Sequence, residues 1–254
     1  MKMGAEKIIV TGHQPVYLPW LGLFHKISLA NIFIFMDDVQ YLEKDWNNRN
    51  KIKTPHGPKW LTVPVSVKKS ASPILKDIVI DTSRRGTKDD WQLEHWKTIE
   101  GNYKRAPHFN KYAGFFQDMY VQKTWEKLAD LNEYQLKYFL KEFGISIEYY
   151  KASVLQFTQK KSDLVLEHCL KFKADICVTG ALGKNYIKEE DFAARKIKVY
   201  YQNYSHPSYN QLWGEFAPFM SVIDLLFNHG AESWEIIAKG NILKEDLIRE
   251  SVLN

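Results

Sequence analysis

A histidine and three further polar or aromatic residues follow the first apolar run of the chain. The run Ile8–Val10 predicts a strand, and the loop after it contains four candidate binding side chains: His13, Gln14, Tyr17 and Trp20. Ligands of open α/β sheets bind at the carboxyl ends of strands, so this loop stands where a site would form. His13 could act as a general acid–base or donate a hydrogen bond to a developing anion. The alternative is that His13 only holds the loop to a backbone carbonyl.

Two carboxylates follow the second apolar run, Asn31–Met36, which has the length of a buried parallel strand. Asp38 is a candidate catalytic group and Asp37 a candidate ligand for a sugar hydroxyl or a substrate amine; either could instead cap the next turn. Downstream lie an arginine and two asparagines: Asn48, Arg49 and Asn50. Such a set offers bidentate anion contacts and amide donors, although a solvated loop would look similar.

A second candidate base, His95, lies on a helix predicted over Asp89–Ile99, between aromatic residues. A histidine in that setting is a catalytic candidate or a buried structural group. Tyr103 follows it and is a candidate substrate contact. The histidine at 13 and the one at 95 therefore compete for the role of base, and the sequence leaves that choice open.

A glycine-containing loop follows the apolar run Ile176–Val178. Its candidate binding residues are Thr179, Gly180, Gly183 and Tyr186. Free backbone N–H groups in such a loop could hold a phosphate, and the segment is expected to enter a helix. The spacing is shorter than that of a P-loop, and a tight β–α turn would explain the glycines equally well.

The last polar groups lie beyond residue 200. His206 and Tyr209 follow a predicted strand, and an amphipathic helix is predicted over Phe219–Asn228. Three polar residues of that helix fall on one face: Ser221, Asp224 and Asn228. They could be directed into a polar site or form a buried network that holds the C-terminal part together. We expect His13, Asp38, Arg49, Gly180 and Asp224 to converge in one cleft.

The elements that position these residues alternate between strands and helices. Further strands are predicted over 60–67, 74–80, 145–150 and 197–201, and further helices over 21–29, 124–143, 162–172 and 189–196, with Ser162 as a cap and Gly144 as a stop. The pattern predicts an α/β fold with a mostly parallel sheet, crossover helices and a helical insertion. We expect one domain over 1–254, with a mainly helical segment at about 85–143.

Composition narrows the class of protein. The net charge of +5 comes from 35 basic and 30 acidic residues mixed along the chain, which mildly favours anionic ligands and argues against a nucleic-acid partner. Cys169 and Cys177 are expected to be buried small residues rather than a disulfide or a catalytic thiol. No signal peptide, membrane span or zinc spacing is visible, so we expect a cytoplasmic protein without a metal. The sequence indicates neither a cofactor nor an oligomeric state.

Together, these motifs resemble the WbqC-like family. The resemblance rests on Gly12-His13-Gln14-Pro15, on Asp37-Asp38-Val39-Gln40, on Asn48-Arg49-Asn50 and on the closing Ser221–Asn228 segment, and it covers Gly12 to Gly230. Family members are linked to bacterial surface-polysaccharide gene clusters. One departure is Thr179, where serine is expected more often; the hydroxyl is retained.

The resemblance implies action on a nucleotide-linked amino sugar in O-antigen or capsule biosynthesis, with N-acylation or aminoacylation of the sugar amine as the leading reaction. The substrate partner would then be a nucleotide sugar or another small anion. Two alternatives stay open: a non-catalytic binding or assembly factor for the polysaccharide machinery, and an enzyme that transfers a nucleotidyl or adenylyl group.

Overall fold

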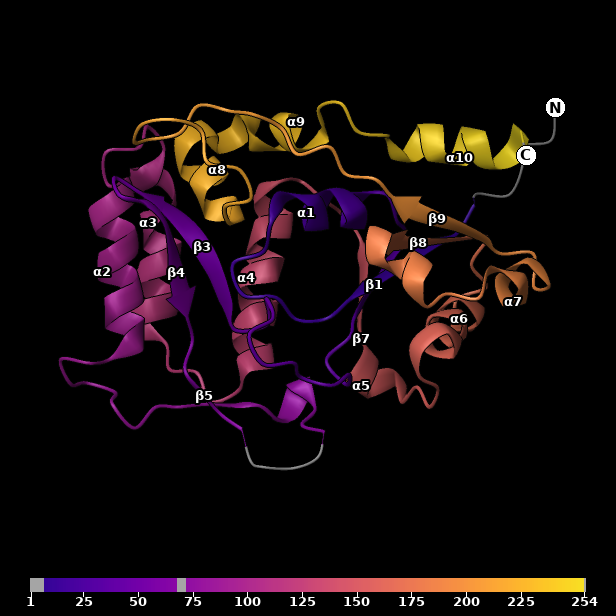
Figure 1. Cartoon of the computed structure of the whole chain (residues 1–254), viewed down its shortest axis with the longest axis horizontal. Helices are drawn as coiled ribbons and strands as arrows, with labels where there is room; N and C mark the ends of the chain where they lie inside the picture. Colours follow the sequence, from indigo (N-terminus) through magenta and orange to yellow (C-terminus); the bar gives the residue numbers. More distant parts are fainter. Residues whose placement is uncertain (1–6, 68–71, 254) are drawn as a thin grey trace.

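A computed structural model of the chain describes residues 7–67 and 72–253. Five strands form one parallel sheet at one end of the molecule, and a β-hairpin and several helices gather at the other end (Figure 1). The strand order is β7 (Glu148–Lys151), β2 (Ile32–Phe35), β1 (Ile9–His13), β8 (Ile176–Gly180) and β9 (Lys198–Gln202). The predicted α/β fold with a parallel sheet is confirmed.

The order of the strands places a topological switch point at the centre of the sheet. From β1 the chain builds outward on one side through β2 and β7, and then returns to add β8 and β9 on the other side. Thr11 pairs with Phe33 on β2 and with Val178 on β8, so β1 is hydrogen-bonded on both edges. The carboxyl ends of β1 and β8 therefore lie side by side, where open α/β sheets bind their ligands.

Both faces of the sheet are covered, which explains why its central strands are continuous apolar runs. Ile9, Phe33 and Val178 point to one face, where α1 (Leu21–Ser28), α4 (Leu128–Glu142) and α10 (Lys244–Leu253) pack. Val10, Ile34 and Cys177 point to the other face. There they meet the crossover helices: α5 (Ala152–Leu155), α6 (Lys161–Lys171) and α7 (Glu189–Ala193).

The segment after β2 differs from the sequence prediction. It forms an antiparallel hairpin of β3 (Arg49–Thr54) and β4 (Gly57–Thr62), followed by the short pair β5 (Val65–Ser66) and β6 (Val79–Ile80). The predicted strand over 60–67 is thus split in two, and the one over 74–80 begins with a 3₁₀ turn, Leu75–Asp77, and is a strand only at β6. β3 was not predicted, because asparagine and lysine occupy positions that a strand pattern reserves for apolar residues.

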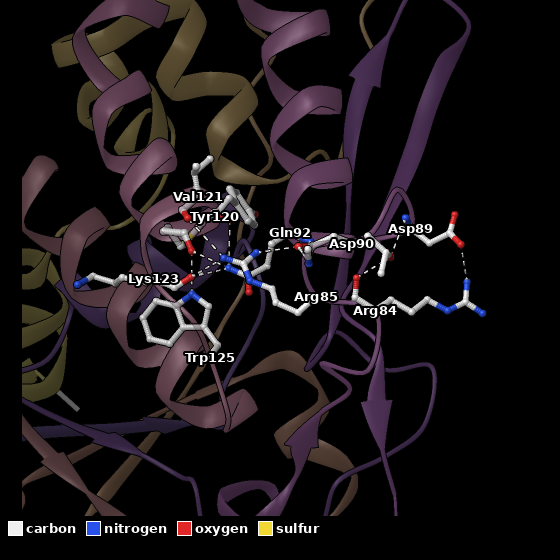
Figure 2. A network of polar contacts seen from close by, with 12 residues as sticks. Arg84, Arg85, Asp89, Asp90, Gln92, Tyr120, Val121, Lys123 and Trp125 are labelled. Carbon is white, nitrogen blue, oxygen red and sulfur yellow. Dashed lines mark hydrogen bonds and ion pairs between the residues drawn. The ribbon is translucent and has the colours of Figure 1, made fainter.

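The predicted helical insertion is present. It contains α2 (Trp91–Tyr103), α3 (Phe109–Gln117), a π-helical turn over Asp118–Gln122, and α4, which starts later than predicted. α3 was not anticipated. Asp90 caps α2 by accepting the Gln92 N–H, and it pairs with Arg85 at 3.0 Å. The Gln92 amide donates to the carbonyls of Met119, Tyr120 and Lys123 and so satisfies the π-helical turn (Figure 2).

The remaining helices are α8 (Val222–His229) and α9 (Ser233–Ala238), which lie along one side of the molecule with α10 (Figure 1). The prediction that Ser162 caps α6 is wrong: the cap position is Lys160, and the Ser162 hydroxyl accepts the N–H of Lys188. Gly144, with φ +65°, ends α4 as predicted. Within the described residues, none of the helices has the length and apolar character needed to cross a membrane.

Candidate functional site

His13 is the last residue of β1 and lies half-buried at the carboxyl edge of the sheet. Its Nδ1 donates to the Gln14 carbonyl oxygen at 2.9 Å, because a carbonyl can only accept. The Nε2 lone pair is therefore the free acceptor of the ring. Burial, assisted by the nearby charge of Lys26, lowers the pKa of His13 to about 3. The imidazole is neutral at physiological pH and can take part as a hydrogen-bonding group or a weak base.

Lys26, which the sequence did not single out, lies behind His13. It is 5% exposed, and its Nζ donates to the Gly12 carbonyl oxygen at 3.0 Å. No carboxylate oxygen of a described residue lies within 4 Å of this amine, although it is buried. Burial lowers the pKa of Lys26 to about 7. A lysine in the last turn of a helix ordinarily faces water, which is why sequence reasoning passed over it.

A row of aromatic rings extends from His13 to the hairpin. The His13 ring meets Trp20 edge-on at 5.2 Å between centroids, Trp20 lies 6.2 Å from Trp46, and Trp46 lies 5.5 Å from Trp60. Trp60 is 42% exposed at the end of this row. The Arg49 guanidinium lies 4.5 Å from the Trp60 ring centroid and the Lys51 amine 5.2 Å from it. The row therefore presents stacking surface and positive charge together.

The asparagines of the 47–50 segment donate hydrogen bonds to backbone carbonyls, and two of them hold the loop after β1 in this way. The side-chain amide of Asn47 donates to the Pro15 carbonyl at 2.7 Å, and that of Asn50 donates to the Leu18 carbonyl at 2.5 Å. Asn48 instead donates to the Val63 carbonyl beyond β4 at 2.9 Å. These contacts fix the loop in space, including Leu18 at φ +43°. Asn48 and Asn50 thus act in the structure as supports for the row.

The remaining polar residue of the loop, Gln14, is half-buried and stays near the row. Its amide donates to Asp45 at 3.2 Å, next to Trp46 in the chain. Arg49 also donates to the Lys44 carbonyl. The loop after β1 and the start of the hairpin are therefore joined by side-chain contacts on both sides of the row.

His95 lies in the core rather than at the edge of the sheet. It is 4% exposed, and its Nδ1 accepts the hydroxyl proton of Tyr17 at 2.8 Å, while that hydroxyl also contacts the Tyr120 hydroxyl. Burial lowers the pKa of His95 to about 3, with only partial compensation by a hydrogen bond to the Thr62 backbone. Tyr17 and His95 therefore belong to a buried hydrogen-bond network that joins the loop after β1 to the helical insertion.

The two carboxylates after β2 have different environments. Asp37 accepts the backbone N–H of Ser153 at 2.9 Å and its hydroxyl at 2.7 Å, so it caps α5. Asp38 has a buried Oδ1 that finds no hydrogen-bond partner among the described residues. Burial and the charge of Asp37 raise the pKa of Asp38. Asp38 is therefore the member of the pair with capacity for a ligand or a proton.

Asp224 lies in a separate buried network with Tyr103 and Tyr209. The Tyr103 hydroxyl donates to Oδ1 at 2.8 Å, and Oδ2 accepts the Tyr209 hydroxyl at 3.0 Å and the Gln211 amide at 2.7 Å. Burial raises the pKa of Asp224 in spite of these donors. The network ties α8 to α2 and to the loop after β9. Asp224 is 0% exposed, so it offers no open contact.

The other residues predicted around α8 lie at its start and end. Ser221 precedes the helix, pairs with Trp20 in an isolated bridge, and has a buried hydroxyl without a partner among the described residues. Asn228 donates back to the Asp224 carbonyl at 2.7 Å. His206 lies 4.9 Å from the Phe219 ring and contacts the Pro207 carbonyl. Ser221 thus adjoins the aromatic row, whereas His206 and Asn228 do not contact it.

The loop after β8 forms a 3₁₀ turn, Ala181–Asn185, rather than the α-helix expected there. A Cβ on Gly183 would lie 2.6 Å from the Thr179 hydroxyl oxygen, whereas one on Gly180 would meet open space. Thr179 and Tyr186 line a small cavity of about 40 Å³ between β1, β8 and α6, together with Gly12, Met36, His168 and both cysteines. The Nε2 of His168 is buried without a partner among the described residues.

The cysteines are free and buried, in agreement with the sequence expectation. Among residues 7–67 and 72–253 the structure holds no group of three metal-ligating side chains. Most of the predicted residues therefore fall into four groups: the row at the edge of the sheet, the Tyr17–His95 network, the Asp224 network and the cavity at β8. Asp37 and Asp38 at the end of β2, and His206 beside Phe219, lie outside these groups. Trp46 and Trp60 were missed; an aromatic residue inside an otherwise polar segment was the available signal.

Comparison with known proteins places the chain beside one protein family and one relative. A family model described as the WbqC-like protein family matches residues 14–236. An uncharacterized protein of Mycobacterium tuberculosis, Rv1507c, is 36% identical over 221 residues, which span 87% of this chain and 93% of that protein. No solved structure matches the chain.

Proposed function

The chain belongs to the WbqC-like protein family, and from this premise we propose that it is a transferase for a nucleotide-linked amino sugar in the biosynthesis of O-antigen or capsule. The reaction would place an acyl or aminoacyl group on the sugar amine. The observation that carries the proposal is the row of rings from half-buried His13 to exposed Trp60, flanked by Arg49 and Lys51.

The row fits the two chemistries of a nucleotide sugar. Indole faces stack on nucleobases, and such stacking contributes about 1–3 kcal/mol per base. The guanidinium of Arg49 matches phosphate oxygens in a bidentate geometry, and Lys51 adds a second positive charge on the same side of Trp60. The diphosphate would accordingly lie against the hairpin, with the sugar toward His13.

The transfer needs a proton acceptor. As the amine nitrogen attacks the donor carbonyl, a C–N bond forms, the bond to the donor's leaving group breaks, and one amine proton must be removed. His13 Nε2 and Asp38 Oδ1 are the candidate acceptors at the ends of β1 and β2.

One observation favours a second candidate function, a binding factor without catalysis. The pKa of about 3 at His13 and at His95 makes both histidines weak bases at neutral pH. In that case the row would retain or deliver the nucleotide sugar, and no acyl product would form.

Calorimetric titration with UDP-, GDP- and dTDP-linked amino sugars tests the binding. Trp60→Ala is expected to weaken the affinity about 5- to 150-fold, which corresponds to the 1–3 kcal/mol of one stacked base. Phe219→Ala is the matched control and should leave the affinity unchanged, because Phe219 is exposed and its ring contacts His206 rather than the rings of the row. Equal affinities for all three proteins would refute the role of the row.

His13→Gln separates the two candidate functions. A general base at this position predicts unchanged binding and a turnover lowered by about 10²–10⁴-fold, measured with an acyl donor and product analysis. If His13 serves only binding, the variant should change affinity, and no acylated sugar should be found even with the unaltered protein.

A further inference from the structure

The side chain of Lys26 extends from α1, the helix that follows the loop after β1, to the carboxyl edge of the sheet. Because α1 begins where this loop ends, its N-terminus lies near the carboxyl end of β1. Helical side chains lean toward the N-terminus of their helix. The Lys26 side chain accordingly extends back to the Gly12 carbonyl, one residue before His13. Gly12 and His13 are both half-buried, so the amine lies just beneath the exposed edge of the strand.

A lysine at this position does not serve the stability of the fold. Charged groups are buried in proteins when a partner compensates for lost hydration, whereas the described part of the chain gives this ammonium a single backbone acceptor. Methionine would fill the same space without any cost of desolvation. A buried lysine that destabilises the fold, at the edge where α/β sheets bind ligands, indicates a functional role.

Among the described residues, no carboxylate lies within ion-pair distance of Lys26. His13 on β1 is neutral, and its pKa is lowered further by the lysine itself. The nearby Cys177 on β8 raises the pKa of Lys26 and offsets the effect of burial only in part. The neighbouring His25 is hydrogen-bonded to Gln202 and to the Ile242 carbonyl. Burial lowers the pKa of Lys26 to about 7, which leaves the amine part-protonated at neutral pH.

We propose that Lys26 binds an oxyanion of the substrate, a phosphate or a carboxylate, beside His13 at the end of β1. The anion supplies the negative charge that Lys26 does not receive from a described carboxylate. The attraction between the two charges is strong because the site has a low dielectric constant. Binding then takes up a proton at Lys26. This inference rests on the proposed function only in assigning the oxyanion to the nucleotide diphosphate or to the carboxylate of the acyl donor.

Sulfate is the first probe, because it remains a dianion from pH 6 to pH 9. Calorimetric titration at constant ionic strength should show an affinity that falls about fiftyfold between pH 7 and pH 9, since the protonated fraction of a group with a pKa of about 7 falls by that factor. Lys26→Met should abolish this pH-dependent part of the binding, and Lys26→Arg should retain binding with a flat pH profile.

Lys244→Met is the matched control. Lys244 also donates to a backbone carbonyl, that of Ala30 at 3.2 Å, but it lies on α10. This variant should bind sulfate as the unaltered protein does, and far-ultraviolet circular dichroism checks that every variant is folded. Sulfate binding with the same affinity and pH profile in Lys26→Met as in the unaltered protein would overturn the proposal.

Competition at pH 7 identifies the source of the oxyanion. Displacement of sulfate by pyrophosphate supports the nucleotide diphosphate, and displacement by acetate supports the donor carboxylate; displacement by neither would contradict a substrate oxyanion at Lys26. The result is separable from that of the proposed function. Nucleotide-sugar binding that depends on Trp60, without any effect of Lys26→Met on sulfate, refutes only the present inference. The reverse outcome refutes only the stacking site.

Discussion

Lys26→Met should make the protein more stable at neutral pH, by an amount that depends on pH. Burial takes the pKa of Lys26 from 10.5 to about 7 on folding. Between these values the unfolded chain holds a proton that the folded protein has released, so the free energy of unfolding rises with pH at about 1.36 kcal/mol per unit. Because the folded-state amine is half protonated at pH 7, this lysine adds about 2.3 kcal/mol of stability from pH 7 to pH 9. Methionine does not titrate and lacks this increment.

Urea denaturation at pH 6, 7, 8 and 9 measures the effect, because urea leaves the ionic strength unchanged. Relative to the unaltered protein, Lys26→Met should have its largest advantage at pH 6 and lose about 2.7 kcal/mol of it between pH 6 and pH 9. Other titrating groups are common to both proteins and cancel in the difference. The control Lys244→Met should show no such trend. Parallel stability profiles for the unaltered protein and Lys26→Met would refute the buried-amine reasoning.

Three further substitutions test the supports of the site by chemical denaturation. Gly183→Ala should destabilise the protein by about 1–3 kcal/mol, because its Cβ would lie 2.6 Å from Thr179, whereas Gly180→Ala meets open space and should cost less than about 1 kcal/mol. Asp90→Ala removes a helix cap and should cost about 0.5–2 kcal/mol; the exposed Asp89→Ala should be near neutral, and equal costs would count against the cap (Figure 2). Tyr103→Phe deprives the buried Asp224 of a donor and should cost about 1–3 kcal/mol; a loss below about 0.5 kcal/mol would show that the network readjusts.

Local patterns were sufficient for the sheet. The apolar runs at Ile8–Val10, Asn31–Met36 and Ile176–Val178 each coincide with all or part of a strand of the parallel sheet, because the covered part of such a strand is apolar on both faces. The hairpin escaped prediction for the opposite reason. In β3 the inward position at Asn50 is polar, and its burial is made acceptable by its bond to the Leu18 carbonyl and by the N–H of Lys51, which its oxygen accepts.

The identity of the candidate residues was also visible in the sequence, but their roles were not. His13, Trp20 and Arg49 were selected for their chemistry, and the structure places all three along one row. His95 and Asp224 were selected on the same grounds, and both proved to be buried in hydrogen-bond networks. The type of a side chain determines which hydrogen bonds and ion pairs it can make. Its actual partners lie on segments far away in the chain, and the local sequence does not reveal them.

The sequence by itself therefore determined the class of fold and the loops that carry polar chemistry, since both follow from the local alternation of apolar and polar residues. Only the tertiary structure decided which polar groups are already paired and which are left with an unmet charge or hydrogen bond. Lys26 shows the physical reason. Both the desolvation of its amine and the role proposed for it in binding an anion arise from burial, and burial depends on what packs around a residue rather than on its neighbours in the chain.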